Sequence, residues 1–192
     1  LAVGLHAVDV AGLATGEDVL VVGAGPVGLA VAVWAKILGA RRVVVSDPAG
    51  HRRALAAKFG ATDLVDPARE ELLPAFERAT GHAPRLAFEC VGRPGVVQQI
   101  AQIAPRGAKI LSAGMCMAPD SYVPLVFGAK ELTLQFCSYY RRQDYELTLA
   151  MLEAGRLDPL PMVTDRIGLD ELPGAFERLR KPTTECKVIV QP

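Results

Sequence analysis

The residues with the clearest chemical signature are three glycines in the run Gly23-Ala24-Gly25-Pro26-Val27-Gly28. In such a GxGxxG run the first glycine permits a tight turn and the second lets a pyrophosphate approach the backbone. The third lets a helix pack closely on a strand. A helix that begins within the run would also point free amide groups at the phosphates. A bare run of this kind can equally make an ordinary turn, so the surrounding sequence has to support a phosphate site.

An acidic residue supplies that support. Asp47 follows Gly28 by 19 residues, where a carboxylate can accept hydrogen bonds from both hydroxyls of an adenosine ribose. The same carboxylate would repel a 2′-phosphate, so the spacing predicts NAD rather than NADP as the cofactor. Arg52 and Arg53 are competing evidence because they could pair with such a phosphate. Arg52 could instead lie beside the adenine, neutralise Asp47, or be solvated at the start of a helix.

Short apolar runs alternate with helical patterns and place the glycines between a strand and a helix. Residues 18–22, Asp18-Val-Leu-Val-Val22, form an unalternating β-branched run typical of a strand buried on both faces. Residues 27–38 have the pattern of a helix that Gly39 ends. The other predicted strands are 42–46, 63–65, 86–89, 108–111 and, after a loop of mixed character, 131–136; the other predicted helices are 1–14, 51–59, 70–80 and 95–104, with Pro74 interrupting the third of these. This order predicts an α/β fold with a doubly wound, parallel, six-stranded sheet, a Rossmann fold.

The pattern changes after the sixth strand. A helix is predicted at 144–154, Asp170 would cap a further helix, and a last strand is predicted at 186–190. We therefore divide the chain into a cofactor-binding domain, 1–155, and a short C-terminal αβ extension, 156–192. The extension has too little apolar surface to fold alone.

Ligands of an open parallel sheet bind beyond the carboxyl ends of its strands. Cys90-Val91-Gly92 follow the fourth predicted strand, and Ala113-Gly114 follow the fifth. Val91 and Ala113 are small enough to let a flat ring lie against the sheet edge, whereas Cys90 is interpreted first as a small hydrophobic residue. The three histidines fall on separate elements, so we expect no catalytic residue in this chain.

Composition excludes several functions. The 192 residues carry 21 Lys+Arg and 21 Asp+Glu, which gives no reason to expect nucleic acid or an anionic membrane as a partner. The uncharged run 19–35 is interrupted by glycines and a proline and is too short to span a bilayer. Four cysteines, at 90, 116, 137 and 186, lack the spacing of a zinc site or a redox motif. We expect a reducing, cytoplasmic location and no signal peptide.

Several segments resemble one known family. They are 20–29, Ser46-Asp47 with Arg52, 88–92 and 107–111. Together they resemble the nucleotide-binding domain of zinc-dependent medium-chain alcohol dehydrogenases. Residues 1–8 and 138–140 are most similar to the polyol (sorbitol) and threonine dehydrogenase branch. The resemblance implies NAD-dependent hydride transfer between an alcohol carbon and the nicotinamide ring, with zinc polarising the oxygen.

The resemblance also implies roles for individual residues. Gly23, Gly25 and Gly28, with Pro26 and Val27, would hold the pyrophosphate. Asp47 would bind the ribose and Arg52 would lie on the adenine side. The nicotinamide half would lie against Val91 and Ala113, beside Cys90, Gly92 and Gly114, and Lys187 would bind a phosphate. Lys187 could equally be an exposed strand charge. The strand 131–136 would pair with its copy across a twofold axis, because its apolar and polar residues alternate as in a half-exposed edge. This predicts a homodimer, although a covered edge would show the same pattern.

The resemblance is incomplete. Family members carry an N-terminal GroES-like barrel that holds the catalytic zinc ligands, and this sequence has no counterpart of it. We therefore expect no zinc in this chain, no turnover by the chain alone, and a C-terminal segment that would rejoin an absent catalytic domain. A zinc-free, NADPH-dependent quinone reductase and a non-catalytic dinucleotide-sensing module are the alternatives, and a methyltransferase fits less well because no acid ends the first strand.

Overall fold

A six-stranded parallel sheet forms the centre of the protein in the computed structural model, which describes residues 1–180 and 184–192. Its strands are β1 (Val19–Val22), β2 (Val43–Ser46), β3 (Asp63–Val65), β4 (Leu86–Glu89), β5 (Lys109–Ser112) and β6 (Thr133–Phe136). Their order is β3-β2-β1-β4-β5-β6, which confirms the predicted doubly wound Rossmann fold. The order reverses between β1 and β4, and this switch point opens a crevice at the carboxyl edge of the sheet.

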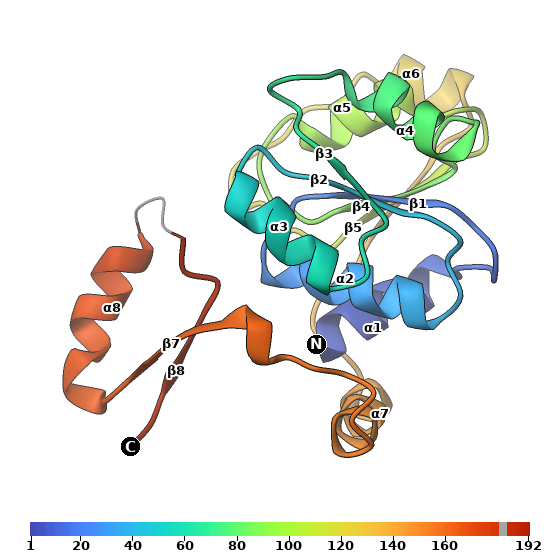
Figure 1. Ribbon diagram of the computed structural model, residues 1–192. Helices are drawn as coiled ribbons and strands as arrows, with labels where there is room; N and C mark the ends of the chain where they lie inside the picture. Colours follow the sequence, from blue (N-terminus) through green and yellow to red (C-terminus); the bar gives the residue numbers. More distant parts are fainter. Residues whose placement is uncertain (181–183) are drawn as a thin grey trace.

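Helices cover both faces of the sheet (Figure 1). One face carries α1 (Ala2–Ala11), α2 (Pro26–Ile37) and α3 (Gly50–Lys58), and the other carries α4 (Leu72–Thr80), α5 (Val96–Ile103) and α6 (Pro124–Ala129). Successive strand residues alternate between these layers. Val19 and Val21 pack into the core beneath α1 and α2, whereas Leu20 packs into the core beneath α4 and α5. The central strand is therefore apolar at every position, as a strand buried on both faces must be.

Two lysines tie helix ends to neighbouring elements. The Nζ of Lys109, on β5, donates to the carbonyls of Val10 and Ala11 at the end of α1, at 2.9 and 3.1 Å. The Nζ of Lys130 donates to the carbonyls of Ala101, Gln102 and Ala104 at the end of α5, at 3.0, 2.6 and 2.9 Å. Each ammonium group satisfies carbonyls that a helix end leaves without partners and lies at the negative end of the helix dipole.

The C-terminal part begins with α7 (Arg142–Glu153) and continues through the short turns Leu160–Met162 and Leu169–Glu171 to α8 (Leu172–Leu179). It also holds β7 (Val163–Ile167) and β8 (Lys187–Val190), which pair in parallel as a separate two-stranded sheet. Figure 1 shows this sheet and α8 beside the main sheet rather than within it. The expected C-terminal αβ extension is therefore present, while the domain boundary at 155 stays a prediction.

A polar cluster attaches α7 to α1. Asp144 is 4% exposed, and its Oδ2 lies 3.0 Å from the Nδ1 of His6. Arg141 donates to Asp144 and to Asp9, and these bonds hold the pKa of Asp144 below its ordinary value, with the Arg141 hydrogen bond as the largest cause. His6 is thus a packing residue with a hydrogen-bond partner, as its place on an apolar helix indicates.

Several element predictions need correction. The region expected to be a loop before β6 contains α6, and β6 itself begins at Thr133 rather than at residue 131. Helix α4 begins at Leu72, so Pro74 lies in its first turn, where a missing amide donor costs nothing. Asp170 does not cap α8, because it lies in the preceding 3₁₀ turn and Glu171 occupies the N-cap position.

Candidate dinucleotide-binding site

The turn between β1 and α2 is so crowded that two of its glycines are sterically required. Gly23 has φ +101°, and a Cβ there would lie 2.9 Å from Val91 Cγ2 and 3.0 Å from the Cys90 backbone. A Cβ on Gly28 would lie 1.8 Å from the carbonyl oxygen of Gly23. Both contacts are shorter than real carbon contacts allow. The turn is therefore packed against the strand end of β4 as well as against itself.

Gly25 is different. It is the N-cap of α2 and has an extended backbone, with φ −74° and ψ −179°. A Cβ there would meet none of the described residues within 4 Å, so packing does not require a glycine. No side chain of the described part of the chain caps this helix end, and Pro26 occupies its first turn. Gly25 thus leaves open space in front of a helix N-terminus, where amides and the helix dipole favour an anionic group.

Asp47 lies against this turn. The carboxylate is 4% exposed, its Oδ2 accepts from the amide of Ala24 at 2.9 Å, and its Oδ1 accepts from the amide of Ala49 at 2.8 Å. Arg52 Nη1 lies 4.0 Å from Oδ2. The acid at the end of β2 is therefore fixed beside the glycines, and each of its oxygens retains acceptor capacity for a further donor.

The second candidate arginine is committed elsewhere. Arg53 donates through Nη1 to the carbonyl of Asp47 at 2.5 Å and through Nη2 to Asp66 Oδ2 at 2.7 Å. Both contacts tie α3 to the ends of β2 and β3. Of the two arginines weighed as partners for a 2′-phosphate, Arg53 therefore has a structural role, and Arg52 is the one beside the Asp47 carboxylate.

Sequence reasoning missed a second buried acid at the same edge of the sheet. Glu89, the last residue of β4, is 2% exposed. Its Oε1 accepts from the amides of Val91 and Gly92 at 2.6 and 2.7 Å, and its Oε2 accepts from Ser112 Oγ at 2.9 Å. The signal was available, since an acid that ends a buried apolar strand needs a specific reason to be there.

The predicted residues around Glu89 differ in accessibility. Val91 is 39% exposed, Ala113 is 7% exposed and Cys90 is half-buried. Burial raises the pKa of the Cys90 thiol well above its ordinary value, and the charges of Glu89 and Cys137 raise it further. The raised pKa disfavours the thiolate, which is the reactive form of cysteine, in line with the interpretation of Cys90 as a small hydrophobic residue.

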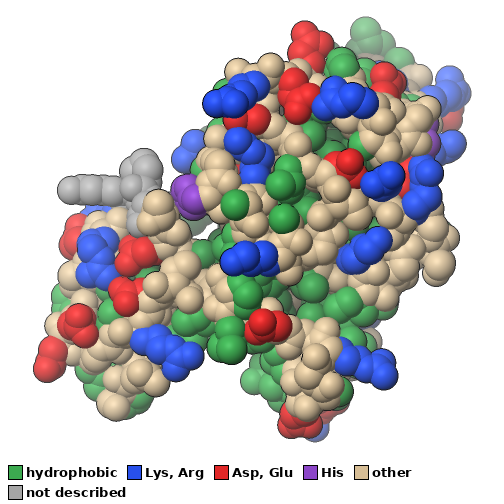
Figure 2. All heavy atoms as spheres, in the orientation of Figure 1, with side chains coloured by type: hydrophobic (Ala, Val, Ile, Leu, Met, Phe, Trp, Pro, Cys, Tyr) green, Lys and Arg blue, Asp and Glu red, His purple; other side chains and the backbone are tan. Residues whose placement is uncertain are grey.

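A groove of about 1450 Å³ runs along the switch point. Predicted residues that line it are Gly23, Gly25, Pro26, Asp47, Arg52, Cys90 and Val91. Predicted residues that are absent from its lining are Val27, Gly28, Gly92, Ala113, Gly114 and Lys187. Arg69 and Arg93, which the sequence reasoning did not select, line it as well. Figure 2 shows basic and acidic side chains interspersed on the face in view, in keeping with the balanced charge.

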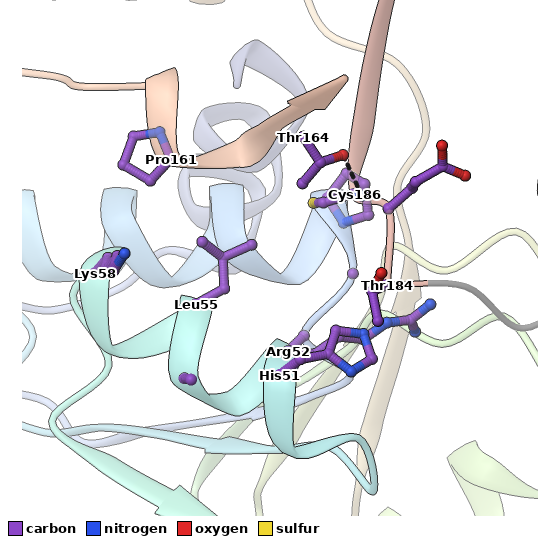
Figure 3. A pocket seen from close by; sticks show the side chains of 13 residues that line it. His51, Arg52, Leu55, Lys58, Pro161, Thr164, Thr184 and Cys186 are labelled. Atoms are coloured by element: carbon purple, nitrogen blue, oxygen red, sulfur yellow. Dashed lines mark hydrogen bonds between the residues drawn. The ribbon is translucent and has the colours of Figure 1, made fainter.

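A second, smaller cleft of about 240 Å³ lies between α3 and the C-terminal strands (Figure 3). His51, Arg52, Leu55 and Lys58 approach it from α3, and Pro161, Thr164, Thr184 and Cys186 from the C-terminal part. The Cys186 amide donates to Thr164 Oγ1 at 2.9 Å. Gly25 and Pro26 line this cleft and the larger groove, so the C-terminal strands lie beside the start of α2. Lys187 follows Cys186 with an exposed side chain.

Neither metal nor membrane features appear in what the structure describes. No group of three or more His, Cys, Asp or Glu residues within 1–180 and 184–192 is placed to hold a metal ion. Within the same residues, no helix combines the length and apolar character needed to cross a membrane. His51 is exposed beside the small cleft, whereas His6 and His82 contact Asp144 and Asp18 on other parts of the fold.

Together, the glycine turn after β1, the acid at the end of β2 and the groove at the switch point define a dinucleotide-binding domain of the Rossmann class. A family model described as zinc-binding dehydrogenase matches residues 26–154. The chain therefore belongs to the zinc-binding dehydrogenase family, which confirms the resemblance seen in the sequence. Members of this family bind NAD or NADP.

Individual relatives agree with this assignment. Sorbitol dehydrogenase of Ovis aries is 32% identical over 94% of this chain and 52% of its own length. L-threonine 3-dehydrogenase of Anaeromyxobacter dehalogenans strain 2CP-1 is 33% identical over 86% of this chain and 48% of its own length. A solved zinc-binding dehydrogenase of Sinorhizobium meliloti, bound to NADP, has a TM-score of 0.85 and 26% identity over 100% of this chain and 57% of its own. The chain thus spans about half the length of the curated relatives it matches.

Proposed function

We propose that this chain binds NAD across the switch point and forms the cofactor-binding half of an NAD-dependent alcohol or polyol dehydrogenase. The observation that carries the proposal is the Asp47 carboxylate, held 2.9 Å from the Ala24 amide within the glycine turn. An acid fixed there can grip a ribose while the helix N-terminus takes the pyrophosphate. The residues we assign to the site are Gly23, Gly25, Pro26, Val27, Gly28, Asp47, Arg52, Cys90, Val91, Gly92, Ala113, Gly114 and Lys187.

The residues present fit this cofactor. The open space at Gly25 suits a pyrophosphate, because a side chain there would project into the groove instead of into the protein. The buried charge of Asp47 disfavours a phosphate on the adjacent ribose, and Arg53 is tied to Asp66. Arg52 offsets part of the Asp47 charge at 4.0 Å without removing it. NAD is therefore favoured over NADP.

Bound NAD would accept or donate the hydride, and the residues of this chain would bind and orient it. The glycine turn fixes the pyrophosphate and Asp47 the ribose, while the Val91 and Ala113 edge supports the nicotinamide half. Zinc, which would polarise the alcohol oxygen, would be held by ligands outside this chain. Four free cysteines are consistent with a cytoplasmic location.

Titration of the purified chain with NAD and NADP tests the proposal. NAD at one hundred times its Kd should stabilise the fold by about 2.7 kcal/mol, a rise of roughly 5–10 °C in Tm. Asp47→Asn should abolish the preference for NAD over NADP. Asp63→Asn, which removes a half-exposed carboxylate on β3 outside the groove, is the matched control and should leave the preference intact.

The alternatives predict other outcomes. An NADPH-dependent quinone reductase domain would bind NADPH more tightly than NADH, which would refute the NAD assignment. A dinucleotide-sensing module would bind NAD but would lack alcohol oxidation in the whole protein. That activity is measured by the appearance of NADH on addition of secondary alcohols or polyols.

We also propose that the chain forms a homodimer through β6. This strand lies at the edge of the sheet, and Phe136 at its end is 64% exposed. Pairing with a second copy would satisfy the edge and cover that ring. Light scattering should give twice the 20.4 kDa mass of one chain. Phe136→Asp should give a folded monomer, and a wild-type chain that stays monomeric at high concentration would contradict this proposal.

A further inference from the structure

Glu89 is a buried acid to which the proposed function gives no role. It ends β4 at the carboxyl edge of the sheet and is 2% exposed. Three hydrogen bonds reach its carboxylate: the amides of Val91 and Gly92 donate to Oε1, and the Ser112 hydroxyl donates to Oε2. A carboxylate in this position is tolerated only because such donors replace water. The bonds link the loop after β4 to the end of β5.

The backbone around this carboxylate is closely packed. The carbonyl of Glu89 accepts from the amides of Ala113 and Gly114 at 2.8 and 2.9 Å. A Cβ on Gly114 would lie 2.4 Å from the Gly92 nitrogen and 2.7 Å from Glu89 Oε2. The loops after β4 and β5 are therefore packed on each other with the Glu89 carboxylate between them.

These two loops form the second half of the candidate site. A doubly wound sheet takes one mononucleotide unit on each side of its switch point. Asp47, at the end of β2, marks the adenosine side, so the ends of β4 and β5 fall on the other side. The amide of Val91 donates a hydrogen bond to Glu89, and Val91 is 39% exposed and lines the groove. The Glu89 carboxylate itself lies behind the loop, away from the groove lining.

We propose that Glu89 is a positioning residue for the nicotinamide half of the cofactor, an inference that rests on the proposed function. Its carboxylate fixes the backbone of Val91 and Gly92, and through Ser112 it joins that loop to β5. The nicotinamide nucleotide then meets a preformed surface. Without the carboxylate, the amides of Val91 and Gly92 lose their acceptor, and the loop has to reorganise before the ring can bind.

The test compares three ligands that share the adenosine half: NADH, ADP-ribose, which lacks nicotinamide, and AMP. Affinities are measured by calorimetry on the 192-residue chain. Glu89→Gln keeps the shape but replaces charge-assisted hydrogen bonds with neutral ones, which should weaken NADH binding about fivefold. Ser112→Ala should weaken it by a similar factor. ADP-ribose and AMP should change less than twofold in both variants.

A matched control separates positioning from general stability. Asp18 is also a buried carboxylate, 3% exposed, but it precedes β1 at the opposite edge of the sheet and binds Arg41 and His82. Asp18→Asn should lower Tm and leave the ratio of NADH to AMP affinity unchanged. If Glu89→Gln weakens all three ligands equally, or none, this inference is wrong while the proposed function stands. If the wild-type chain binds none of them, both fail.

Discussion

Replacing Gly28 or Gly25 of the first turn by alanine should have opposite effects: the first change should reduce stability, and the second should reduce NAD binding. A Cβ on Gly28 would lie 1.8 Å from the Gly23 carbonyl oxygen, far inside a normal contact, and neither a backbone oxygen nor a Cβ can rotate away. Gly28→Ala should therefore separate α2 from the turn and cost at least about 2–3 kcal/mol of unfolding free energy. At Gly25 the same methyl group meets open space, and the extended backbone suits alanine.

The expected cost at Gly25 is close to zero because two small effects oppose each other. Alanine is a poorer N-cap than glycine by about 0.5–1 kcal/mol, while the reduced freedom of the unfolded chain returns about 0.4–1 kcal/mol. NAD binding should nevertheless weaken at least tenfold, because the methyl group occupies the space proposed for the pyrophosphate. Urea unfolding and NAD calorimetry on both variants measure the two quantities. A Gly25→Ala chain that loses stability like Gly28→Ala, or binds NAD normally, would refute the reasoning.

Three further predictions concern the framework. Lys130→Met should lower the unfolding free energy by about 1–3 kcal/mol in urea, because the end of α5 loses the ammonium that three carbonyls share; Lys58→Met, at an exposed position, should change it little. The lowered pKa of Asp144 stabilises the fold above the unfolded value of 3.8, so the advantage of wild type over Asp144→Asn should be present near neutral pH and shrink as pH falls below about 4. Iodoacetamide should label exposed Cys116 at pH 7.5 well before Cys90, whose thiol pKa burial raises; equal rates in the folded chain would contradict this.

The sequence was sufficient for those features that depend on local spacing. The turn from Gly23 to Gly28, the buried strand before it and the acid at 47 are all set within one β-α-β unit, so their arrangement follows from alternating apolar runs and turn residues. Helix α6 was missed because it is six residues long and contains Gly128, which leaves no helical periodicity to detect. The prediction that Asp170 caps α8 was wrong because the chain makes a 3₁₀ turn before that helix. Asp170 and Glu171 are both acidic, so residue type alone does not distinguish the cap.

Contacts between residues far apart in the chain could not be predicted from the sequence pattern. Nothing within 86–92 indicates that Glu89 accepts from Ser112, because that bond exists only once β4 and β5 are neighbours. The same applies to Arg53, because nothing in the local sequence indicates that its guanidinium will donate to Asp66. Sequence could therefore name candidates for a 2′-phosphate partner, whereas tertiary structure decides which arginine is already paired.

Two buried acids on opposite sides of the switch point are held in the same way. Asp47 accepts hydrogen bonds from amides in the turn after β1 and at the start of α3. Glu89 accepts hydrogen bonds from amides of its own loop and from a hydroxyl of β5. In each case the carboxylate joins segments that would otherwise be separate loops at the carboxyl edge. Burying either charge is unfavourable on its own, and an apolar residue would pack more cheaply. The benefit we expect is a site whose loops are ordered before the dinucleotide arrives, so that less binding free energy is lost in ordering them.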